Sequence, residues 1–343
     1  MKNKRNIIII AAILIIAVLI PLVFDLGLSK MSILISVLLY MYWASSWNIM
    51  GGYTGLFSLG NGIYIGIGAY ITGCLYYYLG ITPYIGIIIA GLATALFSII
   101  IGYPTFKLQS IFYSLATFAL LNIMKIVFMN FKTILGVYTG GSDGFKFASV
   151  HEPAMMQFTS KLPYYYIILA LLVIVVILSY LISHSKRGYY FRAISANATA
   201  ASSLGVNVLS LKMQAQFISA FFSAIGGGFY CMFINYIDPS KMFGVDLSIN
   251  IMIMCVIGGA NTLWGPIIGS ALLYTINRVV TMYAPSSLTS IATLLFGIIL
   301  MIFVFFLPGG LLPYVNELKE KRSLARRKAA LMQVSSDGGD SNG

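Results

Sequence analysis

Charged residues are scarce in this chain. Of its 343 residues only 9% are charged and 59% are hydrophobic, whereas a soluble domain carries about 25% charged residues. Long apolar runs recur along nearly the whole length. Short segments of alternating polarity, typical of a membrane β-barrel, are not seen. The composition therefore predicts an all-α polytopic integral membrane protein.

Acidic residues and histidines are missing from the predicted membrane interior. The nine acidic residues lie in predicted loops, at span ends or in the tail, and so do His151 and His184. Proton-coupled and many sodium-coupled transporters place carboxylates or histidines within the bilayer. The pattern disfavours such a transporter but leaves it open, because backbone carbonyls also bind sodium.

Motifs for nucleotide, metal and disulfide chemistry are also missing. The sequence has no GxxxxGK[ST] phosphate loop, no CxxC and no cluster of metal-ligand residues. The three cysteines, Cys74, Cys231 and Cys255, all fall in apolar runs and are expected to be buried free thiols. We therefore expect no catalytic residue, no metal site and no cofactor on this chain, and no enzyme activity of its own.

Apolar runs between helix breakers predict about ten membrane-spanning helices, some of them interrupted by glycine. They cover roughly residues 7–24, 31–50, 62–79, 84–102, 112–130, 163–184, 211–236, 246–259, 264–283 and 290–307. The eighth is short for a full crossing and is expected to be broken or re-entrant. The first lacks the small-residue cleavage site of a signal peptide, so we expect it to be retained, with cleavage as the alternative.

The distribution of lysine and arginine predicts the orientation. With the N-terminus in the cytoplasm, the cytoplasmic segments 1–6, 103–111, 185–212 and the tail from 308 hold 14 basic residues, against 5 in the outside loops. This is the bias of the positive-inside rule, and it places both termini in the cytoplasm. It also accounts for most of the net charge of +12, so that no nucleic-acid partner is implied.

The chain divides into a transmembrane domain over 1–313 and a tail over 314–343. The basic start of the tail, KEKRSLARRK, is suited to anionic membrane lipid. The polar end, SSDGGDSNG, is expected to be disordered.

A polar, alanine-rich run, SKRGYYFRAISANATAASSLGVNV, interrupts the apolar pattern at 185–208. Alanine is the best helix former, and Gly205 stands where a helix stop belongs. The run predicts a short cytoplasmic helix from about Arg192 to Leu204. A plain surface helix is the alternative interpretation.

Two glycine-rich segments, 51–70 and 257–270, interrupt the predicted spans. Both contain Gly-Gly-x-x-x-Leu, at 51–56 and 258–263. Each also carries a small-xxx-small pair that lets helices approach closely; the glycines are Gly62, Gly66, Gly265 and Gly269. Interrupted helices in two halves of a chain can mark a central binding site. The six matching letters are weak evidence for an internal repeat. Close helix packing at these glycines is the alternative interpretation.

Four motifs occur in the order of a known family. They are SWNIMGGYTGLFSLGNGIYIGIGAY, TGGSDG, RAISANATAASSLGVNV and VIGGANTLWGPIIGSALL. With the closing FLPGGLLP, the chain from about 31 to 313 resembles the membrane permeases of bacterial ABC importers for branched-chain amino acids, most closely the M-type subunit. Related permeases carry urea or short amides, and those for sugars and nucleosides are more distant.

The resemblance implies partners and a role for the polar run. The implied partners are a homologous second permease, two ATPase subunits that bind ATP and Mg²⁺, and an extracytoplasmic substrate-binding protein. The run 185–208 would be the coupling loop that docks on an ATPase. The residues implied for coupling are Arg192, Ala193, Ala196, Ala200, Ala201 and Gly205.

Polar residues within apolar spans are candidates for the translocation path. They are Ser58, Asn61, Thr117 and Asn122. Hydrogen bonding to a neighbouring helix is the alternative for each of them. The function expected is a permease subunit in the bacterial cytoplasmic membrane, with an ion-coupled transporter and a non-transporting scaffold as weaker hypotheses.

Overall fold

The fold is almost entirely helical over the residues that the computed structural model describes, which are 27–134, 136–147, 152–283 and 309–314, with residues 18, 21, 297, 298, 301 and 317. The long helices are α2 (Leu28–Met50), α3 (Asn61–Leu79), α4 (Pro83–Thr105), α5 (Ser110–Asn130), α6 (Leu162–His184), α9 (Val208–Ile234), α11 (Val245–Gly259) and α12 (Gly265–Tyr283). The short ones are α7 (Lys186–Ala196), α8 (Ala198–Ser203), α10 (Pro239–Met242), η1 (Gly141–Asp143) and η2 (Pro153–Met155).

Among the described residues, six helical segments are long and apolar enough to cross a membrane: α2, α4, α5, α6, α9 and the run of α10 and α11 over 239–259. The chain is therefore an all-α multi-pass membrane protein, but the predicted count of ten spans is not supported. Helices also cover the predicted spans 62–79 and 264–283, as α3 and α12, without joining those six. The predicted spans 7–24 and 290–307 fall outside the described residues, apart from isolated positions.

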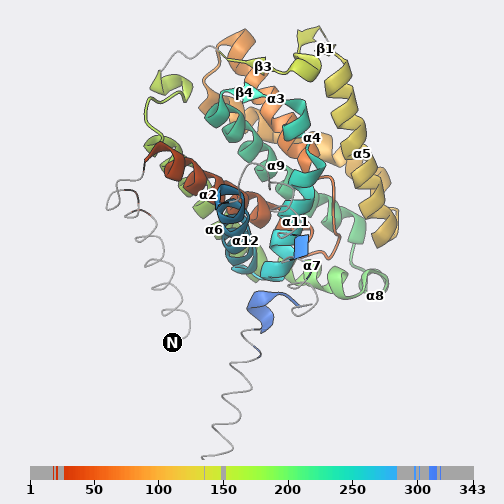
Figure 1. Ribbon diagram of the computed structural model, residues 1–343. Coiled ribbons are helices and arrows are strands. Elements are labelled where there is room, and N and C mark those ends of the chain that lie inside the picture. The colour runs from red at the N-terminus through yellow and green to blue at the C-terminus, as the bar shows by residue number, and fades with distance from the viewer. Residues whose placement is uncertain are drawn as a thin grey trace, which may run out of the picture.

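Helix α9 lies at the centre of the bundle and packs against α3, α4 and α2 (Figure 1). Its approach to α3 is backbone to backbone, because a Cβ on Gly227 would overlap the carbonyl of Ile65, and one on Gly68 would overlap the backbone of Ala224. Small residues allow such contacts between apolar helices in lipid. Helix α2 packs in turn against α6 and α12.

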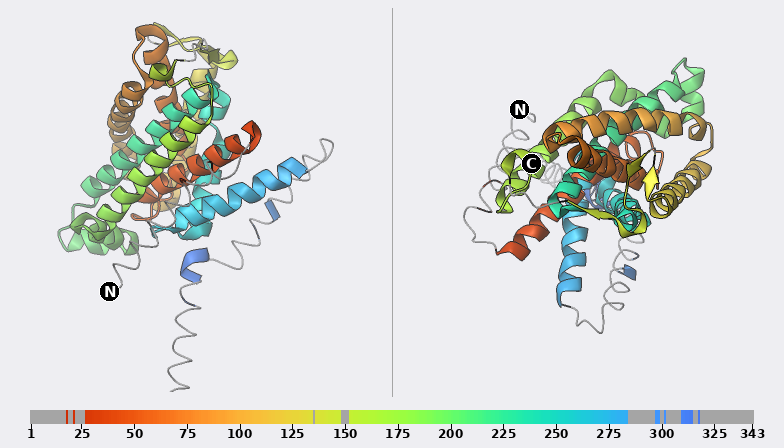
Figure 2. Two further views of the ribbon diagram at one scale, coloured as in Figure 1. Left: turned by 90° about the vertical axis from the view of Figure 1, so that its left-hand side faces the viewer. Right: turned by 90° about the horizontal axis from the view of Figure 1, so that it is seen from above.

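Two ends of the molecule differ in structure. One end carries the short strands β1 (Thr133–Ile134), β2 (Val137–Tyr138), β3 (Phe145–Lys146) and β4 (Tyr236–Ile237), with β1 paired to β2 and β3 to β4 in antiparallel register. The other end carries α7 and α8 (Figures 1 and 2). The two ends of a membrane bundle therefore present different surfaces.

Helix α5 stands at the edge of the bundle (Figure 1). Only 17% of its span is buried, the smallest share among the six candidate spans. Its exposed side chains are large and apolar, among them Ile111, Phe112, Leu115, Ile123 and Ile126. This face is available to lipid or to another membrane chain.

Candidate functional site

The first glycine-rich segment leaves α2 at Met50 and runs without helix from 51 to 60, mostly buried. Irregular backbone at membrane depth is tolerated where protein surrounds it. The indole Nε1 of Trp47 donates to the carbonyl of Ser58 at 2.9 Å, and the hydroxyl of Ser114 donates to the carbonyl of Phe57 at 2.5 Å. Side chains of α2 and α5 thus satisfy the carbonyls that a helix would otherwise pair.

Asn48 joins the first glycine-rich segment to the second. Its Nδ2 donates to the carbonyl of Thr262 at 2.9 Å, and its Oδ1 accepts from the backbone N–H of Asn261 at 3.0 Å. A Cβ on Gly52 would come within 2.8 Å of the same Asn261 nitrogen. The two Gly-Gly-x-x-x-Leu sequences therefore lie side by side, next to the buried side-chain amide of Asn48. The sequence reasoning missed this residue. Its signal was a polar residue three positions before a Gly-Gly pair.

The four glycines of the small-xxx-small pairs all sit at close contacts. A Cβ on Gly62 would lie 2.8 Å from Ser248 Oγ, and one on Gly66 would overlap the Phe243 ring. Likewise, a Cβ on Gly265 would meet the Gly259 carbonyl, and one on Gly269 would meet the carbonyl of Met254. In addition, the Ser248 hydroxyl accepts from the Gly62 N–H at 2.7 Å, a contact that the sequence did not indicate.

The predicted path residues Ser58, Thr117 and Asn122 make two kinds of hydrogen bond. Ser58 Oγ accepts from the N–H of Gly60 at 3.2 Å, and Thr117 Oγ1 accepts from the N–H of Leu59 at 3.1 Å. These two therefore meet at the end of the first glycine-rich segment. Asn122 instead donates to the Phe118 carbonyl of its own helix at 3.0 Å.

Asn61 turns toward α9. Its Oδ1 accepts from the hydroxyl of Ser223 at 2.9 Å, while its Nδ2 is buried with no hydrogen-bond partner. An unpaired buried amide costs about 1–3 kcal/mol. Asn61 is therefore not part of the cluster formed by Ser58 and Thr117.

An open groove of about 420 Å³ lies beside this cluster. It is lined by Phe57, Leu59, Ser114, Met252, Ile253, Val256 and Ile257, so six of its seven lining residues are apolar. The lining comes from the first glycine-rich segment, α5 and α11. None of the four predicted path residues is among these residues, whereas Ser114, one turn before Thr117, is.

The polar run forms two helices instead of one. The predicted continuous helix from Arg192 to Leu204 is wrong, because Asn197 is extended at φ −161° and separates α7 from α8. Its Oδ1 accepts from the N–H of Ala200 at 3.0 Å and so caps α8. Asparagine favours such caps over helix interiors. The helix stop is where the sequence places it, with Gly205 at φ +83°.

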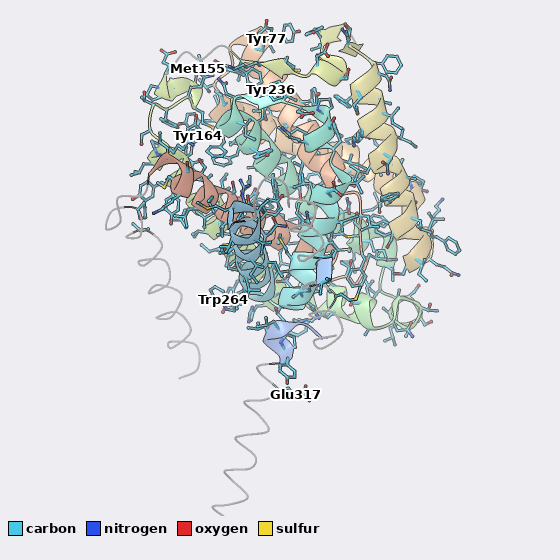
Figure 3. The ribbon with its side chains drawn as sticks, viewed as in Figure 1. Tyr77, Met155, Tyr164, Tyr236, Trp264 and Glu317 are labelled. Atoms are coloured by element: carbon cyan, nitrogen blue, oxygen red, sulfur yellow. The ribbon has the colours of Figure 1, made fainter. Side chains whose placement is uncertain are left out.

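The residues implied for coupling are not all on the surface. Ala193, Ala196 and Ala200 are exposed, but Ala201 is buried within the chain and cannot itself contact a docked partner. Arg192 donates to the carbonyl of Ser183 at 2.7 Å, which ties α7 to the end of α6. In Figure 3 Trp264 lies at the lower edge of the bundle, near this end of the molecule, and Glu317 lies below the bundle.

Leu204 is the most exposed large apolar residue of the polar run, with 85% of its surface open. A leucine is unusual at such exposure in a polar segment. Sequence reasoning missed it, although it directly precedes Gly205, where helices end and side chains project.

Helix α7 touches the first glycine-rich segment. A Cβ on Gly55 would lie 2.6 Å from Ser195 Oγ and 3.3 Å from its Cα. Around this contact runs a buried apolar cluster composed of Ile49, Met50, Tyr53, Leu56, Phe106, Tyr113, Phe191, Ile194, Ala201, Leu211 and Ala215. The exposed helices and the irregular membrane segment are therefore parts of one packed unit.

Comparison with known proteins identifies the family. Residues 29–304 match the family model described as branched-chain amino acid transport system / permease component. The chain belongs to this permease family. Its members are membrane subunits of transport systems, and the six candidate spans of the described residues are consistent with a multi-pass membrane protein.

Two curated relatives match over most of this permease. The high-affinity branched-chain amino acid transport system permease protein LivM of Salmonella typhimurium is 25% identical over 343 residues, covering 93% of this chain and 78% of the relative. LivM of Escherichia coli is 25% identical over 341 residues, covering 94% and 78%. No solved structure matches the chain.

Proposed function

We propose that the chain is one permease subunit of a bacterial ABC importer for leucine, isoleucine or valine, in the cytoplasmic membrane with both termini inside. A second, homologous permease would complete the path. Two ATPase subunits would bind ATP and Mg²⁺, and an extracytoplasmic binding protein would deliver the substrate. This chain would bind no cofactor.

The groove of Phe57, Leu59, Ser114 and α11 is the observation that carries the substrate class. An aliphatic side chain transfers favourably onto an apolar wall, at about 25 cal/mol per Å² of apolar area removed from water. Urea or a short amide, the alternative substrates, has little aliphatic surface to place on this lining, in which Ser114 is the one polar side chain. The adjoining face of α5 is exposed and apolar, which suits a second permease that closes the groove.

The end of the molecule that carries α7 and α8 is the surface on which the ATPase would dock. It presents exposed small residues and Leu204, and residues 185–212 contain four basic residues and no acidic one. The strand-bearing end would face the binding protein. Among the described residues no group of three metal-ligand side chains is found. Asp143, Glu152 and Asp238 lie in loops or short turns, and Asp246 lies in the first turn of α11, so an ion-coupled transporter has less support.

Assembly with ATPase subunits tests the proposal. We would co-express the chain with a second permease and two ATPases, purify the complex, and measure ATP hydrolysis stimulated by loaded binding protein. The isolated chain should hydrolyse no ATP. Failure of any ATPase to associate with the wild-type chain would contradict the proposal.

The variant Ala200→Trp should uncouple the assembled complex, because an indole on the exposed face of α8 would hold the ATPase away. We expect stimulated hydrolysis to fall at least about tenfold, the equivalent of roughly 1.4 kcal/mol. The matched control is Ala170→Trp, an exposed alanine within α6, away from both docking ends. Equal activity of the two variants would remove α8 from the docking surface.

A further inference from the structure

Lys212 is a largely buried lysine with no counter-ion among the residues that the structure describes. It lies in the first turns of α9 with only 9% of its surface exposed. The ion pairs Lys132–Asp143 and Lys241–Asp238 lie elsewhere. The Lys212 side chain borders a pocket, so its ammonium is partly desolvated, which favours pairing with an anion.

The side chain of Lys212 lines a pocket of about 550 Å³ at the α7–α8 end. The other lining residues are Phe106, Lys107, Ser202, Gly205, Val206, Asn207, Val208 and Leu209. Lys107 brings a second positive charge, and the first turn of α9, which Asn207 caps at the Ser210 N–H, brings the positive end of a long helix dipole. Three independent features thus favour an anion at one place.

The surroundings of the pocket indicate which anion. Ser202 and Gly205 join the pocket to α8 and to Leu204, whose exposed apolar side chain is suited to packing on a protein surface. The segments 103–111 and 185–212 together carry five basic residues and no acidic one. A partner that covers this end must therefore supply the negative charge.

We propose that the pocket of Lys107 and Lys212 receives the carboxylate of an Asp or Glu side chain of the docked ATPase subunit. The carboxylate would pair with the Lys212 ammonium, and Leu204 would pack on the ATPase beside it. This inference rests on the proposed function, and it adds a charge-paired anchor to the small-residue contact of α8.

The first test measures ATPase binding. Permease pairs in nanodiscs would be titrated with purified ATPase at low and high salt. Lys212→Met should weaken binding at least about tenfold, since truncating one partner of a desolvated charge pair has large effects, and it should reduce the salt dependence. The matched control Lys146→Met removes an exposed charge at the opposite end and should change neither.

Thermal unfolding separates a partner site from a structural lysine. In the isolated chain, Lys212→Met removes an unpaired buried charge and should leave the midpoint equal or raise it. In the assembled complex, the same change should lower the midpoint. A lower midpoint already in the isolated chain would show that Lys212 supports the fold and would overturn the inference.

A zero-length carbodiimide cross-link identifies the anion. In the wild-type complex we expect an amide between Lys212 and one ATPase carboxyl group, located by mass spectrometry. The pocket could instead bind lipid headgroups. In that case this cross-link would be absent, and Lys212→Met would weaken ATPase binding in anionic nanodiscs but not in phosphatidylcholine nanodiscs. That result would overturn the inference. If wild type and Lys212→Met assemble equally well with the ATPase, this inference is overturned and the proposed function stands. If wild type does not assemble with any ATPase, the proposed function is overturned as well.

Discussion

The two glycine-rich segments share the sequence Gly-Gly-x-x-x-Leu but lie in different surroundings. The first, 51–60, is supported by side chains of α5 and touches α7 through Gly55 and Ser195. The second, 258–264, packs backbone on backbone, with Gly258 against Gly265 and Gly259 against Gly310. Side-chain contacts can exchange, whereas interlocked backbones cannot. We therefore expect the first segment to move with the docking helices and the second to stay fixed.

Breaking the fixed segment should have the largest effect. A side chain in Gly258→Leu would overlap the Gly265 carbonyl and come within 2.9 Å of the Gly269 Cα. Backbone cannot yield as side chains do, so we expect a cost above about 3 kcal/mol and little folded protein. The measurement is the yield of monodisperse protein by size exclusion and its unfolding midpoint. Gly27→Leu, which meets nothing within 4 Å, is the control; equal yields for both would refute the fixed contact.

Separating the two segments should have an intermediate effect. Asn48→Leu removes the amide that bonds Asn261 and Thr262 and leaves both backbone groups without this partner. We expect the free energy of unfolding to fall by about 1–3 kcal/mol, measured by denaturant titration in detergent. The control is Asn130→Leu, which removes an exposed amide bonded only to its own helix at Ile126. A loss no greater than in this control would mean that Asn48 does not hold the segments together.

Disturbing the first glycine-rich segment should affect coupling more than stability. Gly55→Ala adds a methyl group against Ser195 and places a non-glycine residue at φ +71°. The backbone term alone costs about 1–2 kcal/mol. Gly136→Ala carries the same kind of strain, at φ +81°, with open space around it. We expect Gly55→Ala to lose somewhat more stability than Gly136→Ala, because Ser195 must move, and we expect Gly55→Ala alone to lower the substrate transported per ATP hydrolysed. A normal transport ratio would remove the contact from the coupling route.

Much of the helical frame is readable from the sequence because lipid imposes it. Apolar runs of about twenty residues bounded by glycine, proline or lysine predict α4, α5 and α6 to within three residues at each end. Glycine pairs such as Gly265 and Gly269 indicate close contacts for the same reason, since packing replaces the hydrophobic effect between helices in a membrane. The number of crossings does not follow so directly, because helices such as α3 carry glycine and tyrosine among their apolar residues.

The site was harder to predict because it depends on long-range pairing. The sequence marks Ser58 and Thr117 as polar groups in apolar spans, but not that both bond the backbone of the first glycine-rich segment. The break at Asn197 depends on its side chain capping α8, a local competition that alanine-rich composition conceals. The burial of Ala201 follows from that break, which turns α8 onto α9.

The central claim is that a bound ATPase, and not an ion gradient, drives transport through this permease. Its most direct test is uptake of labelled leucine into vesicles that contain the chain with its second permease and ATPases, with ATP inside, binding protein outside and all ion gradients abolished by ionophores. The account predicts uptake that stops when ATP is withheld. Uptake by the chain alone, driven by a proton or sodium gradient without ATP, would contradict it.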